Sequence, residues 1–352
     1  MTWPPRPAIM RPHMASITRR QLLSSVPALA LLPRTLGAAQ AAAPIRVRTI
    51  NHFAIAVADT KRSIDFYQGL FGMPIVATNG PSTMLRVGAG PQFISIGPVA
   101  NGAAPSITHF CLGMEGFNVD RVLASLAEHG VKKGERPGPL TAMVSVRGAT
   151  GGNAGTPDLL FGDPDGITCQ IQDVTYCGGS GPLGNVCTPQ PAPKKGVLAL
   201  RDMNHLTIFS SDAARANKFY QDVFGFSIRS YQGPTSPTMA VGPTAQFLMF
   251  TGGGAPSATP RPASINHACM NMDNFKTDDV LKALTDYGLK PRETGKPVGP
   301  LQHYVTMRLE NRGGAPGAGT AELYFTDPDG LLMQLQDASY CGGSGLLGEI
   351  CK

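Results

Sequence analysis

This chain of 352 residues contains two copies of one sequence pattern, and the duplication is what most restricts how it can fold. Asn51 to Gly72 reads NHFAIAVADTKRSIDFYQGLFG, and Asn204 to Gly225 reads NHLTIFSSDAARANKFYQDVFG. A second motif, DPDGITCQIQDVTYCGGSGPLGNVC, begins at Asp163 and returns in altered form at Asp327. The copies lie 153 and 164 positions apart, which is about the length of one domain. The sequence therefore predicts two domains of the same fold in tandem.

The segment before the first copy predicts an export signal rather than part of the fold. Thr18-Arg19-Arg20-Gln21-Leu22-Leu23 opens an apolar stretch, and the small residues Ala38 to Ala43 follow it. This order is typical of a twin-arginine signal with cleavage at Ala39-Gln40-Ala41. A disordered basic tail or a short membrane anchor is the alternative, but two prolines and an arginine interrupt a stretch already too short to span a bilayer. We expect a periplasmic or secreted protein without a membrane span in its mature form.

The basic charge of the chain belongs mostly to this leader. Residues 1–43 hold five Arg and no Asp or Glu, so their removal lowers the formal net charge from +6 to +1. The remaining sequence shows no cluster of Lys and Arg with interleaved aromatic residues. We therefore do not expect nucleic acid as a partner.

Four of the seven cysteines predict two local disulfides. Cys177 and Cys187 bracket a Gly-rich segment, and Cys341 and Cys351 bracket its copy. An oxidising compartment allows such pairs to close, and the duplication favours the local pairing among the three that four cysteines permit. The alternative is four free cysteines that serve as small apolar residues.

The hydrophobic pattern divides each domain into two similar halves. In the first half, Asp59 is a plausible N-cap for a helix that Gly72 ends, and a strand precedes it. The pattern restarts near Thr108, with a further helix over about 119–128. Further helices are expected over 213–224 and 278–287, and the closing strands over 167–172 and 331–336. Each half thus reads as a strand, a helix and three strands.

These features together resemble the vicinal oxygen chelate superfamily, which includes glyoxalases, extradiol ring-cleaving dioxygenases and bleomycin-resistance proteins. The resemblance covers about residues 45–340, and its carriers are the repeated NH openings, the FYQ-x2-FG helix ends and the DPDG turns. It implies an α+β fold in which four βαβββ modules form two tandem glyoxalase/dioxygenase-like domains, with curved mixed sheets around clefts. We assign residues 1–43 to the signal peptide, 44–187 to the first domain, 188–199 to a Pro-rich linker and 200–352 to the second domain.

The resemblance also implies a divalent metal ion held by side chains of the first and last strands. The candidate ligands are His52, His109 and Gln170 in the first domain, and His205, His267 and Gln334 in the second. The family usually carries Glu at the last position, whereas both copies here carry Gln. A neutral amide oxygen binds a cation more weakly than a carboxylate, so affinity should fall and Lewis acidity rise. Alternatively, both glutamines hydrogen-bond to the histidines in a metal-free cleft.

The second domain carries the additional candidates for catalysis. His303 and Tyr304 stand where the first domain has Ala142 and Met143, and Tyr324 stands in place of a leucine. The resemblance implies an acid/base role for His303 and an orienting role for Tyr304 or Tyr324. Since neighbouring residues of a strand point to opposite faces, at most one of His303 and Tyr304 can face the cleft, and both could be ordinary strand residues.

Two functions of different classes follow from this sequence. The first is an exported metal-dependent enzyme, extradiol dioxygenase-like or glyoxalase-like, acting on a small substrate that chelates the metal through adjacent oxygens. The second is a non-catalytic small-molecule binding protein of the bleomycin-resistance type, which the two glutamines favour. The sequence does not distinguish among Fe, Mn, Zn, Ni and Cu, and it names neither the substrate nor the oligomeric state.

Overall fold

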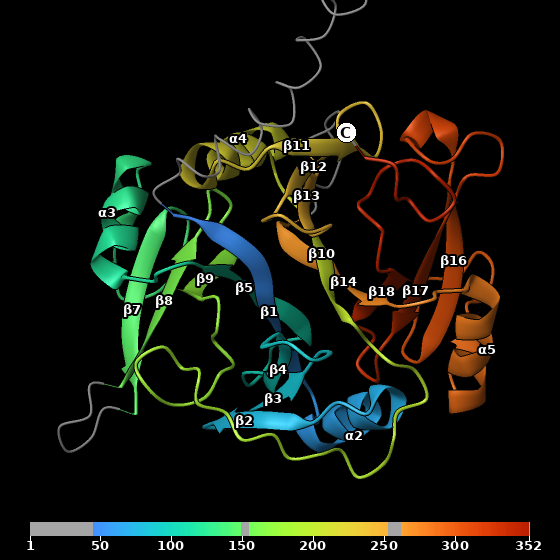
Figure 1. Cartoon of the computed structure of the whole chain (residues 1–352), viewed down its shortest axis with the longest axis horizontal. Coiled ribbons are helices and arrows are strands. Elements are labelled where there is room, and N and C mark those ends of the chain that lie inside the picture. The colour runs from blue at the N-terminus through green and yellow to red at the C-terminus, as the bar shows by residue number, and fades with distance from the viewer. Residues whose placement is uncertain (1–44, 149–154, 253–261, 352) are drawn as a thin grey trace, which may run out of the picture. The chain divides into compact units, whose positions relative to one another are not determined.

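The structure is a computed structural model that describes residues 45–148, 155–252 and 262–351. The predicted signal peptide lies outside the described residues. All the described residues belong to one compact unit, which contains two nine-stranded mixed sheets (Figure 1). We call the first sheet with its helices lobe one, and the second sheet with its helices lobe two. Among the described residues, no helix is long and apolar enough to cross a membrane.

The strand order of the first sheet is β2-β3-β4-β1-β5-β9-β8-β7-β6. Its strands are β1 (Val47–Val57), β2 (Ile75–Asn79), β3 (Ser82–Arg86), β4 (Phe93–Pro98), β5 (Ser106–Met114), β6 (Lys132–Lys133), β7 (Thr141–Arg147), β8 (Thr156–Gly162) and β9 (Thr168–Asp173). The helices of lobe one are α2 (Thr60–Phe71) and α3 (Val119–Glu128). Two modules thus meet side by side, because β1 and β5, the first strand of each, pair antiparallel at the centre of the sheet.

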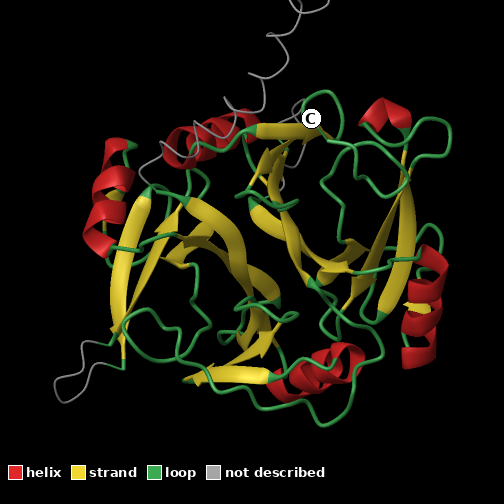
Figure 2. Cartoon of the chain, viewed as in Figure 1, coloured by secondary structure: helices red, strands yellow, loops and turns green. Residues whose placement is uncertain are grey.

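Lobe two repeats this topology in the order β11-β12-β13-β10-β14-β18-β17-β16-β15. Its strands are β10 (Asp202–Phe209), β11 (Ile228–Tyr231), β12 (Pro237–Ala240), β13 (Phe247–Thr251), β14 (Ser264–Met272), β15 (Lys290–Pro291), β16 (Gln302–Arg308), β17 (Thr320–Thr326) and β18 (Leu332–Asp337). Its helices are α4 (Ala213–Phe224), α5 (Thr277–Tyr287) and the 3-10 helix η1 (Glu310–Arg312). Helices are few beside the strands (Figure 2), so the predicted α+β class and tandem duplication are confirmed.

The first helix of each lobe begins and ends on the signals that the sequence predicted. The side chain of Asp59 accepts a hydrogen bond from the backbone N–H of Arg62, and Gly72 ends α2 with a φ of 66°. Asp212 and Gly225 do the same for α4. Glycine has no Cβ, so it adopts this left-handed conformation without strain and stops the helix.

These two helices also connect the lobes. Phe66 and Phe71 of α2 lie against Phe325 of the second sheet, and Phe219 of α4 lies against Phe161 of the first. Such buried rings contribute about 2–3 kcal/mol each to the stability of the fold. The lobes therefore share one apolar core.

The DPDG turns add polar contacts between the lobes. Asp165 accepts hydrogen bonds from Ser210, Ser211 and Arg215 at the start of α4. Asp329, its counterpart in lobe two, accepts from Arg62 and Ser63 of α2. Each turn thus binds the start of the other lobe's helix, which favours one fixed arrangement of the two sheets.

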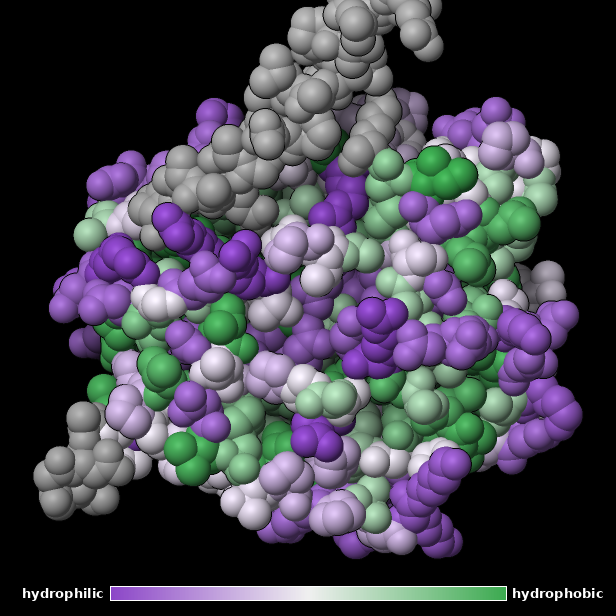
Figure 3. Space-filling view, viewed as in Figure 1, coloured by the Kyte–Doolittle hydropathy of each residue, from purple (hydrophilic) through white to green (hydrophobic). Residues whose placement is uncertain are grey.

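Both predicted disulfides are present. Cys177 bonds to Cys187, and Cys341 bonds to Cys351, each across ten positions. The linker after the first disulfide adds to the sheet edge, because the backbone of Gln190 exchanges two hydrogen bonds with that of Ile75. Hydrophobic and hydrophilic residues are intermixed on the face shown in Figure 3, and exposed large apolar residues are scattered along the chain.

Candidate metal centre

A row of side chains crosses each sheet on one face, and it contains most of the predicted site residues. In lobe two the register pairs each residue with the next in the order Phe247, His205, Cys269, Gln334, Tyr324 and Tyr304. In lobe one the same positions are Phe93, His52, Cys111, Gln170, Leu160 and Met143. Directly paired residues of neighbouring strands lie on the same face, so the fold brings these groups together. His267 and His109 join the face because each lies two residues before its cysteine.

In lobe two, the two imidazoles face each other. The Nε2 atoms of His205 and His267 are 3.3 Å apart, and Gln334 lies on the same face of the sheet, paired with the Cys269 that pairs with His205. Two ligand nitrogens bound to one ion at about 2.1 Å are separated by about this distance when they occupy neighbouring coordination positions. The distance between the two imidazoles is therefore compatible with a shared cation.

Hydrogen bonds to the preceding residue orient the rings. The Nδ1 atom of His205 is 2.7 Å from Oδ1 of Asn204, whose amide nitrogen donates to the carbonyl oxygen of Tyr340. Because that carbonyl accepts only, the amide oxygen must face His205 and must accept the proton of Nδ1. The Nε2 lone pair then points to the centre. This arrangement is usual for histidines that bind metals.

Burial keeps these imidazoles uncharged at neutral pH. It lowers the pKa of His267 from 6.5 to about 4. It also lowers the pKa of His205 well below 6.5, and electrostatic repulsion between the two rings, when protonated, adds to this effect. In lobe one, burial lowers the pKa of His109 to about 4 and that of His52 well below 6.5. A neutral imidazole offers a lone pair to a cation, so burial prepares all four rings for metal binding.

Lobe one has the same pair of rings beneath an open pocket. The centroids of His52 and His109 are 5.5 Å apart, against 5.4 Å for the pair in lobe two. A pocket of about 190 Å³ lies over them, and its lining includes Gln170, Ser95 and Ser145. A small polar molecule could reach the histidines through this pocket.

Each site adjoins a buried carboxylate that the sequence analysis did not identify. In lobe two, Glu322 accepts hydrogen bonds from Arg308, Tyr340 and Tyr324. In lobe one, Asp158 accepts from Arg147 and Tyr176. The signal in the sequence is an acidic residue in each copy, five positions before the first Asp of the DPDG turn, with an arginine at the end of the preceding strand.

The two predicted tyrosines lie at the lobe-two site. Tyr324 meets His267 edge to face, with the ring centroids 5.3 Å apart, and it stacks on Tyr304 at 5.2 Å. Burial, then the charge of Glu322, raises the pKa of Tyr324 well above 10. Its hydroxyl therefore remains a hydrogen-bond donor at neutral pH. The stacked pair gives lobe two an aromatic wall that lobe one lacks, because Leu160 and Met143 replace it there.

The structure does not bring His303 to the paired imidazoles. It pairs with Phe325 on the opposite face of the sheet, and its Nε2 lies 2.9 Å from the hydroxyl of Thr285 in α5. The acid/base role expected for His303 is therefore replaced by a packing role between α5 and β16, because the alternation of the strand assigns the cleft face to Tyr304.

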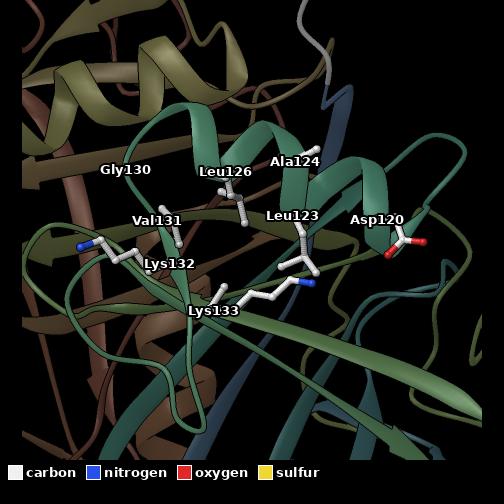
Figure 4. Close-up of a pocket in the computed structure, with 10 residues that line it drawn as sticks. Asp120, Leu123, Ala124, Leu126, Gly130, Val131, Lys132 and Lys133 are labelled. Carbon is white, nitrogen blue, oxygen red and sulfur yellow. The ribbon is translucent and has the colours of Figure 1, made fainter.

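Lobe one shows what happens at this position without a histidine. Ala142 replaces His303, Ala127 replaces Thr285, and a pocket of about 570 Å³ lies between α3 and the sheet. Figure 4 shows Leu126, Val131 and Leu123 pointing into this space. The His303–Thr285 pair therefore fills a gap that the first copy leaves open.

Among the described residues, no group of three or more His, Cys, Asp and Glu side chains is arranged to hold a metal ion. The glutamine of each lobe is the side chain on the same face that offers a further oxygen beside the two histidines. Cys111 and Cys269 are buried and free, and burial raises the pKa of both thiols well above 9. They are neutral at physiological pH and fill the row as small apolar residues.

The fold and the paired His-His-Gln sets define a duplicated protein of the glyoxalase and dioxygenase type. The model of the Glyoxalase/Bleomycin resistance protein/Dioxygenase superfamily matches residues 49–171 and 202–335. The chain belongs to this superfamily, as its resemblance to the vicinal oxygen chelate proteins predicted.

Solved structures with the same fold include two enzyme classes. The Mn(II)-bound glyoxalase from Novosphingobium aromaticivorans is 18% identical, with 83% of this chain and 82% of that chain covered and a TM-score of 0.53. The 2,3-dioxygenase LapB from Pseudomonas sp. KL28 is 14% identical, with 82% and 91% covered and a TM-score of 0.56. Homoprotocatechuate 2,3-dioxygenase from Arthrobacter globiformis is 16% identical, with 83% and 80% covered and a TM-score of 0.54. No curated protein matches the sequence significantly. At these identities the likeness establishes the fold.

Proposed function

We propose that this protein is an exported, metal-dependent enzyme that acts on a small substrate able to chelate the metal through two adjacent oxygens. The observation that carries the proposal is the 3.3 Å between the Nε2 atoms of His205 and His267, on the face of the sheet that also holds Gln334. The Mn(II) ion of the glyoxalase with this fold supports a divalent ion. The two disulfides support an oxidising compartment.

The lobe-two residues fit such a site without a carboxylate ligand. Two neutral imidazoles and an amide oxygen leave the full charge of a divalent ion to be offset by the substrate, which favours an anionic or readily deprotonated chelating group. The ion supplies Lewis acidity, which lowers the pKa of a bound hydroxyl and polarises a bound carbonyl.

The surrounding side chains would bind and orient the substrate. The Tyr304–Tyr324 pair offers a flat aromatic surface beside the metal ligands, which favours a planar substrate such as an aromatic diol. The hydroxyl of Tyr324 donates to Oε2 of Glu322 at 3.3 Å, and this contact fixes its oxygen as a hydrogen-bond acceptor for a substrate. We therefore favour the dioxygenase-like version over the glyoxalase-like one.

The alternative is a binding protein without a metal. In lobe two the Nε2 atom of Gln334 is buried and has no hydrogen-bond partner. Rotation of this amide by half a turn would direct its N–H groups at the two imidazoles and satisfy them without a cation. A cleft closed in this way could still hold a small molecule.

Metal binding separates the two functions. Protein folded in the cytoplasm is stripped with a chelator and titrated with Mn²⁺ by calorimetry. We expect binding, and we expect His267→Ala to abolish it in lobe two, whereas His303→Ala, on the other face of the sheet, keeps it. If no divalent first-row ion binds to either lobe, the enzyme proposal fails and the binding protein remains.

A further inference from the structure

The polar side chains of lobe one are oriented by hydrogen bonds that each end at a group able only to accept. Asn51 donates its amide nitrogen to the carbonyl oxygen of Tyr176, so its Oδ1, 2.9 Å away, must accept the Nδ1 proton of His52. Thr108 is 3.3 Å from the carbonyl oxygen of Ala54 and donates to it. Its oxygen then accepts the Nδ1 proton of the neighbouring histidine, His109. Both imidazoles therefore present an Nε2 lone pair to the site.

Asp158 orients the third group in the same way. The Nε2 atom of Gln170 donates to Oδ1 of Asp158 at 3.1 Å. A carboxylate paired with Arg147 can only accept, so this amide cannot turn around. The amide oxygen of Gln170 is then turned away from Asp158, and Gln170 lines one pocket together with His52 and His109.

Three acceptors thus face one pocket in lobe one. Neutral imidazole nitrogens and an amide oxygen repel one another unless a positive charge lies between them. A divalent cation satisfies all three groups at once.

In lobe two no such contact fixes the orientation of the glutamine amide, although the corresponding residues are similar in type. Glu322 is one methylene longer than Asp158, and its oxygens bind Arg308, Tyr340 and Tyr324 instead of the glutamine. The amide nitrogen of Gln334 is left without a partner. The orientation of the third ligand is therefore fixed in lobe one and free in lobe two.

We propose that Asp158 is a positioning residue which makes lobe one a second divalent-cation site of this protein, by fixing Gln170 with its oxygen towards the two histidines. Asp158 lies behind the neutral ligand and accepts a hydrogen bond from its amide nitrogen. This inference rests on the proposed metal-dependent function but concerns the lobe that lacks the aromatic wall.

The test measures Mn²⁺ binding to lobe one by itself. In the full chain, His205→Ala with His267→Ala removes the lobe-two site, and Mn²⁺ is titrated by calorimetry and by electron paramagnetic resonance. We expect Asp158→Asn to raise the Kd about 10- to 100-fold, the usual effect of losing a residue that orients a metal ligand. Asp173→Asn is the matched control, because Asp173 bonds to Thr175 in a turn and not to Gln170. We expect it to change the Kd less than threefold.

A double-mutant cycle tests whether Asp158 acts through Gln170. If it does, Asp158→Asn has no further effect on the Kd once Gln170→Ala has been made. Should the single variant fail to fold because Arg147 loses its partner, Asp158→Asn with Arg147→Met removes both charges and is titrated instead. An unchanged Kd in the folded variant would overturn the positioning role.

The outcomes for the two lobes are separable. Suppose that the chain with His205→Ala and His267→Ala binds no Mn²⁺, while a chain with His52→Ala and His109→Ala still does. The inference about lobe one is then wrong, and the proposed function stands. If neither background binds the ion, the proposed function fails as well.

Discussion

Replacing the first aspartate of a DPDG turn by asparagine should change how stability depends on pH. Asp163 and Asp327 are buried between the lobes, and burial raises the pKa of each from 3.8 to about 6, against the effect of two backbone hydrogen bonds. Asparagine keeps the oxygen that accepts those bonds from Asp165 and Ile167 and removes the charge.

The sign and size of this pH dependence follow from the difference between the pKa of the carboxyl in the folded and the unfolded chain. A carboxyl with a folded pKa of about 6 and an unfolded pKa near 3.8 destabilises the ionised fold by about 3 kcal/mol above pH 7, and the fold regains this as the pH falls through 6 towards 4. Between pH 7.5 and 4.5 the recovery is about 2 kcal/mol for each aspartate. The stability advantage of Asp163→Asn over the wild type should therefore shrink by about 2 kcal/mol over this interval.

The comparison must be made as a difference between variants. The buried histidines act in the opposite direction, because a lowered folded pKa means that stability is lost as the pH falls below 6.5. Urea unfolding of wild type, Asp163→Asn and Asp327→Asn with intact disulfides gives the free energies. Asp337→Asn, which alters an acceptor in a surface turn, is the control and should follow the wild type. If the difference between Asp163→Asn and the wild type stays constant with pH, the burial argument is refuted.

Two further outcomes test the site. His303→Ala should lower the free energy of unfolding by about 1–3 kcal/mol, because it removes the hydrogen bond with Thr285 and opens a cavity, yet leave Mn²⁺ affinity unchanged. Loss of Mn²⁺ binding would show that His303 does reach the centre. Gln334→Glu should raise the Mn²⁺ affinity of lobe two, measured by calorimetry, since it restores a charged ligand. Gln170→Glu should instead destabilise metal-free lobe one, measured by urea unfolding, because it places a second carboxylate against Asp158. Equal effects of the two substitutions would contradict the difference described between the lobes.

The features predicted correctly from the sequence are those with local signals. The caps Asp59 and Gly72 fix the ends of α2 through contacts within a few residues. The disulfide between Cys177 and Cys187 joins residues ten positions apart, and the same pair of cysteines recurs in the second copy. The resemblance implied that His205, His267 and Gln334 lie on first and last strands, and those strands do pair directly in this fold.

The features that the sequence did not reveal depend on contacts across strands or lobes. His303 and Tyr304 lie on opposite faces of β16, and the pairing of β16 with β17 decides which of them faces the paired imidazoles. No local sequence pattern fixes that choice. The contact of Asp165 with Arg215 joins lobes that are separated by a linker. Asp158 looked like an ordinary strand residue because its partner Gln170 lies on the next strand.

The two copies show how a duplicated site can diverge without losing its ligands. Both lobes keep the row from histidine to glutamine, so the fold itself does not distinguish them. The lobes differ in the length of the buried carboxylate and in the tyrosines beside it. Asp158 is short enough to bind Gln170 and fix it, whereas Glu322 accepts from the hydroxyl of Tyr324. Lobe one thereby gains a fixed third ligand, while lobe two gains an oriented tyrosine hydroxyl in the aromatic wall. We infer that lobe one is built to retain an ion and lobe two to position a substrate.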